Sequence, residues 1–243
     1  IKRLLSFLFV NEYNCILCGR ELPVITRYHL CSGCYAKQEV IGADACLKCG
    51  RMISGEGQYC LDCQNREMSF DRAFSPLCYS GGAASLVMDL KFHNKKYIAT
   101  PMAKWMTDKF LESGLTPDVV MPVPLHAHRK RQRGYNQSEL LAKEIAGGLH
   151  LPIDVTSVSR VKETLASSKL QGGRQAREEN MKDAFVVLDK GSVAGKRILL
   201  VDDVLTTGTT ANELSKALKK AGAAAVYLVT YAVTREKAPI QEV

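Results

Sequence analysis

The stretch that decides the fold is Ile198-Leu199-Leu200-Val201-Asp202-Asp203-Val204-Leu205-Thr206-Thr207-Gly208-Thr209-Thr210. It begins with four consecutive apolar residues, which is typical of a strand buried on both faces of a parallel sheet. A threonine-rich loop then leads into a helical pattern over about Thr209–Ala221, which ends before Gly222. In open α/β sheets, ligands bind at the carboxyl ends of the strands. We therefore expect a ligand site immediately after Val201.

The residues after Val201 have the chemistry for a phosphorylated sugar. Two adjacent carboxylates can accept hydrogen bonds from ribose hydroxyls and help to hold Mg²⁺. The loop supplies backbone N–H groups and hydroxyls at a helix N-terminus, where the dipole favours an anion. The sequence therefore predicts a phosphoribose site, with 5-phosphoribosyl-1-pyrophosphate (PRPP) and Mg²⁺ as its ligands. The predicted binding residues in this stretch are Asp202, Asp203, Thr206, Thr207, Gly208, Thr209 and Thr210.

Two other nucleotide-binding folds also place acidic residues or glycines after a buried strand. The magnesium strand of P-loop ATPases needs a Gly-x-x-x-x-Gly-Lys-Ser/Thr loop elsewhere, and the sequence contains none. A dinucleotide-binding Rossmann fold needs Gly-x-Gly-x-x-Gly after a strand, and this is also absent. A plain capped helix would leave the acidic pair unexplained. The phosphoribose interpretation is favoured over all three.

Around this stretch, apolar periodicity predicts further strands and helices. Strands separated by helices of this length indicate a parallel α/β sheet with helices on both faces. The predicted strands are Phe74–Tyr79, Asp118–Val123, Arg197–Val201 and Ala224–Val233. The other predicted helices are Ala83–Phe92, Tyr97–Glu112 and one that begins at Gln137.

Eight of the nine cysteines form four Cys-x-x-Cys pairs near the N-terminus: Cys15, Cys18, Cys31, Cys34, Cys46, Cys49, Cys60 and Cys63. The phrase Cys-x-Leu/Lys-Cys-Gly-Arg occurs twice, 31 residues apart, which favours two sequential zinc sites over a cross-braced pair. Disulfides would require an exported protein, and no export signal is recognised. Four thiolates per ion leave no open coordination position, so both zinc ions are expected to be structural. Cys78 is predicted to belong to the core.

Composition changes after Cys63, which places a domain boundary near residue 66: a double zinc ribbon at 1–66 and an α/β domain at 67–243. The formal charge of +8 counts the cysteines as neutral. Eight thiolates add −8 and two zinc ions add +4, which leaves about +4. This charge allows modest nucleic-acid affinity without requiring it. No run of apolar residues reaches the length of a membrane span, so no membrane insertion is expected.

Val201–Thr210 resembles the PRPP-binding motif of type I phosphoribosyltransferases. The chain as a whole resembles the ComF family, the competence-associated branch. Besides the cysteine ribbon and the PRPP loop, the resemblance is carried by Val123-Pro124-Leu125-His126, Arg129 and Arg133-Gly134-Tyr135-Asn136-Gln137. It implies that Arg129 and Arg133 contact the pyrophosphate of PRPP. It also implies a cytoplasmic protein that acts on imported single-stranded DNA beside a competence helicase.

The basic segment His126–Arg133 has two further interpretations, a solvated surface and a contact to nucleic-acid phosphates. Tyr135 is the only aromatic residue next to it in the sequence. The resemblance also covers the family's hood, through Arg160, Lys162, Thr164, Leu170, Arg174, Asn180 and Phe185. Where the family commonly has Thr-Pro-x-Gln, this chain has Thr164-Leu165-Ala166-Ser167, so no role in reading an acceptor base is carried over. Residues 166–179 are polar and are predicted to be a mobile lid that closes over ligand.

Three functions remain open from the sequence. The chain is a PRPP-binding factor in the handling of imported DNA, an active phosphoribosyltransferase on an unidentified acceptor, or a zinc-ribbon adaptor with an inert transferase fold. The nucleophile of any transfer reaction is not identified by a motif.

Overall fold

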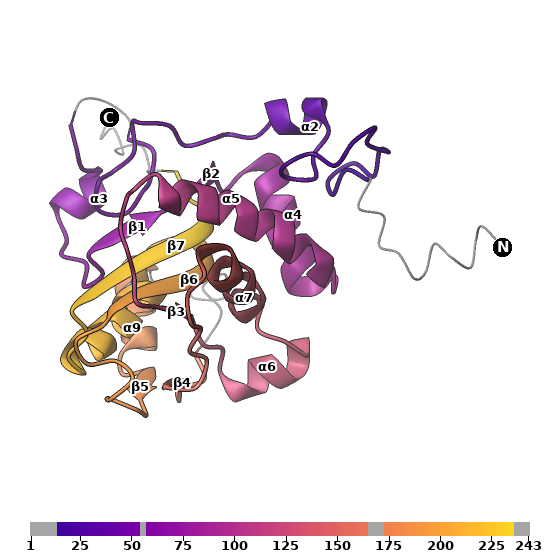
Figure 1. Cartoon of the computed structure of the whole chain (residues 1–243). Helices are drawn as coiled ribbons and strands as arrows, with labels where there is room; N and C mark the ends of the chain where they lie inside the picture. The colour runs from indigo at the N-terminus through magenta and orange to yellow at the C-terminus, as the bar shows by residue number, and fades with distance from the viewer. Residues whose placement is uncertain (1–13, 54–56, 165–172, 236–243) are drawn as a thin grey trace.

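The main sheet of the chain is parallel and has the strand order β1-β7-β6-β3, with β2 also paired to β7 (Figure 1). These relationships come from a computed structural model that describes residues 14–53, 57–164 and 173–235. The strands of this sheet are β1 (Arg72–Phe74), β2 (Leu77–Cys78), β3 (Val119–Pro122), β6 (Arg197–Leu205) and β7 (Ala225–Val233). A separate antiparallel pair consists of β4 (Val158–Arg160) and β5 (Phe185–Val187).

The helices alternate with these strands along the chain. Two short helices belong to the cysteine-rich part, α2 (Ser32–Ala36) and α3 (Leu61–Gln64). The remainder are α4 (Gly81–Phe92), the 3₁₀ turn η1 (Lys96–Ile98), α5 (Ala99–Leu111), α6 (Ala127–Arg133), α7 (Gln137–Leu149), α8 (Gly173–Met181) and α9 (Thr209–Lys220). In Figure 1, α2 lies above α4 and α5, whereas α3 lies beside β1.

Each face of the main sheet is covered by its own apolar core. Alternate residues of a strand point to opposite faces, so β6 sends Leu199 to one core and Leu200 to the other. The first core includes α4, α5 and α7, and the second includes α9. Both residues are fully buried, as the uninterrupted apolar run of β6 predicts. The prediction of a parallel sheet with helices on both faces is therefore confirmed.

The structure differs from the predicted elements in three places. The predicted strand 74–79 is divided into β1 and β2 by Ser75 and Pro76, because a proline has no N–H to donate to the sheet. The predicted helix 97–112 begins with the 3₁₀ turn η1. Strand β6 continues four residues past Val201 to Leu205, since β7 runs beside it through Val233. The acidic pair therefore lies within the strand and not after it.

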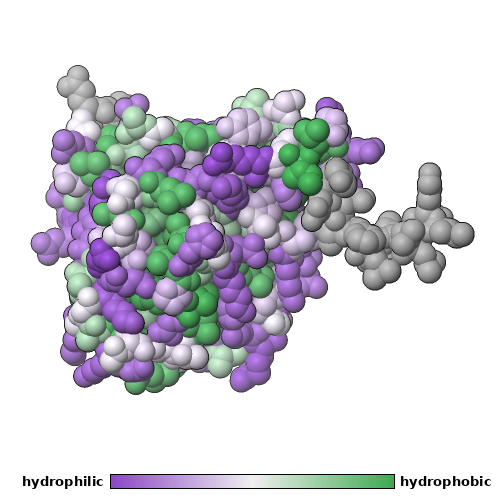
Figure 2. Space-filling model, viewed as in Figure 1, coloured by the Kyte–Doolittle hydropathy of each residue, from purple (hydrophilic) through white to green (hydrophobic). Residues whose placement is uncertain are grey.

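Helix α6 and the β4–β5 pair were not predicted from apolar periodicity. Helix α6 has no buried residue, and both strands of the pair have only three residues. Polar side chains cover most of the face shown in Figure 2, and apolar side chains show between them over the middle of the molecule. Within the described ranges, none of the helices has both the length and the apolar character that crossing a membrane requires.

Candidate functional site

The acidic pair lies on β6, with its two carboxylates in different surroundings. The Asp203 side chain is 5% exposed, and its Oδ1 lies 2.8 Å from the Nζ atom of Lys91. Its Oδ2 is buried and has no hydrogen-bond partner among the residues that the structure describes. Asp202 accepts a hydrogen bond of 2.8 Å from the hydroxyl of Ser138 at the start of α7. Burial and the neighbouring Asp203 raise the pKa of Asp202.

Lys91 was missed by the sequence analysis. It projects from the last turn of α4 and its side chain is 22% exposed. Burial alone would lower the pKa of Lys91, but the nearby carboxylates of Asp203 and Asp202 outweigh burial and raise it. The available signal was the only cation of a mostly apolar helix, next to Leu90, which alone does not identify a partner 112 positions away.

The threonine loop connects β6 to α9; Thr206 is exposed, whereas Gly208 and Thr209 are buried. Gly208 precedes α9 in the left-handed conformation, with φ of 76°. An L side chain rarely adopts this backbone conformation, so glycine is required by geometry here. Thr207 and Thr209 share a hydrogen bond of 2.9 Å between their hydroxyls. The loop thus presents the first N–H groups of α9, which is the arrangement of an anion site.

The two arginines expected on the pyrophosphate side both belong to α6, with Arg133 as its last residue. Arg129 donates to the carbonyl of Thr164 at 2.7 Å. Arg133 lies with its guanidinium carbon 5.1 Å from the centre of the Phe92 ring. Burial lowers the pKa of Arg133, while the carboxylate of Asp203 acts in the opposite direction. The structure therefore brings Arg133 into the electrostatic field of the acidic pair.

The hood lies against the other side of the threonine loop. A pocket is lined by the loop, by Asp202 and by three residues of α8: Arg177, Asn180 and Met181. The sequence analysis did not predict a role for Arg177. In the structure, its Nε is buried and has no partner among the described residues. Arg160 packs its guanidinium over Phe185 at 5.7 Å, and burial lowers its pKa to about 10. The departure at Leu165–Ser167, Leu170 and the first part of the predicted lid lie outside the described residues; the rest of the lid belongs to α8.

The interpretation of Tyr135 as the aromatic residue of the basic segment requires correction. Tyr135 is 8% exposed, and its hydroxyl donates to the carbonyl of Leu90. Phe92 and Tyr97 are the exposed aromatic residues here, at 60% and 46%. Phe92 comes from the end of α4, so only the fold brings it next to Arg133, whereas Tyr97 is the chain neighbour of Lys96 in η1.

The eight ribbon cysteines gather into two sets in chain order: Cys15, Cys18, Cys31 and Cys34, then Cys46, Cys49, Cys60 and Cys63. The sulfur atoms of Cys18 and Cys31 are 3.8 Å apart, and those of Cys49 and Cys60 are 3.6 Å apart. A disulfide would need about 2.05 Å, whereas ligands at about 2.3 Å around a tetrahedral zinc are about 3.8 Å apart. The donor sets therefore fit two structural zinc ions, in the predicted sequential arrangement. Cys78 is buried in β2, as predicted.

The parallel sheet and the two four-cysteine sets define a class of protein, a phosphoribosyltransferase fold joined to a double zinc ribbon. Comparison with known families agrees: residues 92–240 match the phosphoribosyl transferase domain family and residues 4–64 match the double zinc ribbon domain family. The chain is 33% identical over 217 residues to Competence protein F of Haemophilus influenzae, covering 87% of this chain and 93% of that protein. The chain belongs to the competence protein F (ComF) family.

Other relatives agree with this assignment. DNA utilization protein YhgH of Escherichia coli is 30% identical over 87% of this chain and 93% of its own length. Competence protein ComFC of Streptococcus pneumoniae is 28% identical over 86% of this chain and 95% of its own length. Among solved structures, the allosteric regulatory enzyme of purine biosynthesis aligns with a TM-score of 0.40 at 21% identity, over 59% of this chain and 29% of that chain. The family assignment rests on the sequence relatives.

Proposed function

We propose that the pocket at the carboxyl end of β6 binds PRPP with Mg²⁺, and that the protein uses this ligand in handling single-stranded DNA during competence. The observation that carries the proposal is the pocket in which Asp202 meets the threonine loop at the start of α9, next to Asp203, whose buried Oδ2 has no partner among the described residues. A buried carboxylate oxygen without a partner is costly, and a cation or a ribose hydroxyl would satisfy it.

Each part of the ligand has its own group of residues in this proposal. The carboxylates of Asp202 and Asp203 would accept hydrogen bonds from the ribose hydroxyls and would help to hold Mg²⁺. The loop Thr206, Thr207, Gly208, Thr209 and Thr210 binds the 5-phosphate through backbone N–H groups and hydroxyls. Arg129 and Arg133 hold the pyrophosphate, for which the planar guanidinium offers paired donors. Mg²⁺, when bound, neutralises charge on the pyrophosphate.

The same arrangement suits transfer of the phosphoribosyl group, which is the alternative function. A nucleophilic atom of the acceptor would form a bond to C1 of the ribose as the C1–O bond to pyrophosphate breaks. Arg129 and Arg133 would then stabilise the negative charge that develops on the leaving group. Incubation of PRPP with candidate acceptors tests this function. Absence of pyrophosphate release above background with a broad panel would leave ligand binding as the role of the pocket.

Calorimetric titration tests PRPP binding directly. PRPP with Mg²⁺, ribose 5-phosphate and pyrophosphate are titrated separately into the zinc-loaded chain. We expect PRPP to bind more tightly than either fragment, because one molecule then occupies both sides of the pocket. Binding of pyrophosphate alone, with no gain from the ribose, would contradict the roles assigned to the acidic pair and the threonine loop.

A surface next to the pocket favours the DNA part of the proposal. The exposed ring of Phe92 lies against the guanidinium of Arg133 on α6, and the exposed Tyr97 follows Lys96 in η1. Single-stranded nucleic acid is bound by such combinations, since bases stack on aromatic rings while cations contact phosphates. The helicase partner implied by the ComF family remains a proposal about this same surface.

Binding of a fluorescent oligothymidine at several salt concentrations tests this surface. We expect Phe92→Ala to weaken binding by about 1–3 kcal/mol, the range for loss of one stacked base. Leu111→Ala is the matched control, because Leu111 is 58% exposed on α5. Affinity that is weak and does not change with salt would exclude a phosphate-driven site.

A further inference from the structure

The two zinc ribbons have the same backbone but different neighbours. In the first, the Cys15 N–H donates to the Arg20 carbonyl at 2.8 Å; in the second, the Cys46 N–H donates to the Arg51 carbonyl at 2.7 Å. In both copies, the glycine before the arginine has a positive φ, 71° at Gly19 and 67° at Gly50. Arg20 and Arg51 are therefore equivalent positions of one repeated structure.

The first ribbon packs on the helical side of the transferase domain. The ring of Tyr28 stacks on that of Trp105 with 3.8 Å between centres, and its hydroxyl donates to Asp108 on α5. The buried cysteines of this ribbon belong to the same apolar core as α4 and α5. Arg20 is exposed to solvent. No contact recorded for the described part of this ribbon reaches the threonine loop.

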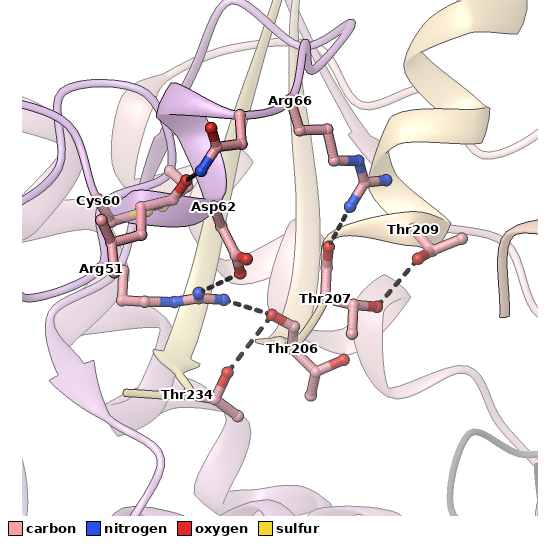
Figure 3. Close-up of polar contacts among 11 residues, drawn as sticks. Arg51, Cys60, Asp62, Arg66, Thr206, Thr207, Thr209 and Thr234 are labelled. Carbon is pink, nitrogen blue, oxygen red and sulfur yellow. Dashed lines mark hydrogen bonds and ion pairs between the residues drawn. The ribbon is translucent and has the colours of Figure 1, made fainter. Parts of the chain in front are cut away.

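The second ribbon packs directly on the threonine loop, and Arg51 joins the two (Figure 3). Its side chain is 7% exposed. Nη1 lies 2.7 Å from the Asp62 carboxylate, which is between the zinc ligands Cys60 and Cys63, and Nη2 donates to the Thr206 carbonyl at 2.7 Å. The guanidinium thus connects the zinc-binding segment to the first residue of the loop.

Arg66 makes a second connection immediately after the ribbon. Its Nη1 donates to the Thr207 carbonyl at 3.0 Å, and its Nη2 lies 3.1 Å from Glu178 on α8. Figure 3 shows Arg51 and Arg66 reaching two consecutive loop carbonyls from the ribbon side. The methyl carbon of Met68 would lie 3.2 Å from a Cβ added to Gly208, so the loop also packs against the chain that leaves the ribbon.

Holding these carbonyls has a defined effect on the loop amides. In a planar trans peptide, the C=O of one residue and the N–H of the next point in opposite directions. A Thr206 carbonyl directed towards Arg51 therefore directs the Thr207 N–H away from the ribbon, and Arg66 does the same for the Gly208 N–H through Thr207. These are the N–H groups available to an anion at the start of α9.

We propose that the second ribbon is a positioning element for the phosphate-binding loop, acting through Arg51 and Arg66, and that the first ribbon has no such role. The inference rests on the proposed function for the identity of the ligand, a phosphorylated ribose. Zinc bound at the second site fixes the segment that carries Asp62, and Asp62 in turn orients Arg51. The duplicated ribbon has thus acquired two functions, one for attachment to α5 and one for orientation of the loop.

The repeat supplies matched variants for the test, Arg51→Met and Arg20→Met at equivalent positions. Both are prepared as full chains with zinc content measured, and each is titrated with ribose 5-phosphate and with pyrophosphate. We expect Arg51→Met to weaken ribose 5-phosphate binding about ten-fold or more, the size of one charged hydrogen bond. Pyrophosphate binding should stay unchanged, because Arg129 and Arg133 are retained. Arg20→Met should match the wild type for both ligands.

Equal loss of both ligands in Arg51→Met, or equal effects of Arg51→Met and Arg20→Met, would overturn the inference. Arg66→Met is the second variant if Arg51→Met does not fold, with the same expected selectivity.

Backbone relaxation measured by NMR separates this inference from the proposed function. Without ligand, the amides of Thr207, Gly208 and Thr209 should have lower order parameters in Arg51→Met than in the wild type or in Arg20→Met. Unchanged order parameters would refute the positioning role even if the protein binds PRPP. Lower order parameters in a protein that binds neither ribose 5-phosphate nor PRPP would support the positioning role and refute the proposed ligand.

Discussion

The ion pair between Lys91 and Asp203 links the stability of the domain to its proposed ligand site, and Asp203→Asn exposes this link. The substitution removes the charge that faces Lys91 but keeps an oxygen that can accept from Nζ. Because Lys91 is 22% exposed and Asp203 is 5% exposed, the pair lies much nearer to the buried than to the exposed limit. Loss of a partner costs about 3–5 kcal/mol in a fully buried pair and about 0–1 kcal/mol on the surface.

The retained hydrogen bond reduces the buried value, so we expect Asp203→Asn to lower the free energy of unfolding by about 2 kcal/mol. Urea denaturation followed by circular dichroism measures this change. The double variant Lys91→Met/Asp203→Asn removes both charges and should be less destabilised than the sum of the two single variants, by at least about 1 kcal/mol. Affinity for PRPP should be reduced in Asp203→Asn and in the double variant.

This comparison also makes the role of the pocket in competence testable. A transformation defect of Asp203→Asn alone has two explanations, instability and loss of the pocket. A defect of the double variant is assigned to the pocket if urea denaturation shows that this variant stays folded under the conditions of the transformation assay. Additive single-variant effects, with an interaction energy within about 0.5 kcal/mol of zero, would refute the reasoning about the pair. Normal transformation by a folded Asp202→Asn/Asp203→Asn variant would instead support the inert-adaptor function.

Three further predictions concern Gly208, Tyr28 and the two zinc sites. Gly208→Ala and Gly195→Ala both place alanine at a positive φ, 76° and 72°, so each should cost about 1–2 kcal/mol of stability. Only Gly208→Ala should weaken the binding of ribose 5-phosphate measured by calorimetry. Tyr28→Ala should lower the free energy of unfolding by about 2–3 kcal/mol, because packing on Trp105 is lost. The control Tyr59→Ala, at an exposed position, should cost less than about 0.5 kcal/mol. Equal values for the two variants would argue against the first ribbon as an attachment to α5. Chelation of zinc should lower the melting temperature, and addition of Zn²⁺ but not of Mg²⁺ should restore it. An unchanged melting temperature in a protein that metal analysis shows to have lost its zinc would contradict a structural role.

The assignment of residues to the PRPP site and the domain boundary near residue 66 stay predictions. The contacts of Arg51 and Arg66 show why a boundary drawn from composition is incomplete. Both residues precede or lie at that boundary, yet both hydrogen-bond to loop residues more than 140 positions away. A change of composition marks where local patterns change, but it carries no information about which surfaces then pack together.

The sequence by itself determined the parts of this protein that depend on local pattern. Four apolar residues before Asp202 specified a central strand, and the spacing of eight cysteines specified two sequential metal sites, because burial and metal coordination both impose short-range regularities. Only the tertiary structure determined which distant side chains meet at the end of that strand. Lys91, Arg177 and Arg51 come from three elements far apart in the chain, and each looks like an ordinary surface cation in sequence. Their roles follow from the parallel sheet, which gathers the carboxyl ends of its strands at one edge, and from the second ribbon, which packs against the loop at that edge.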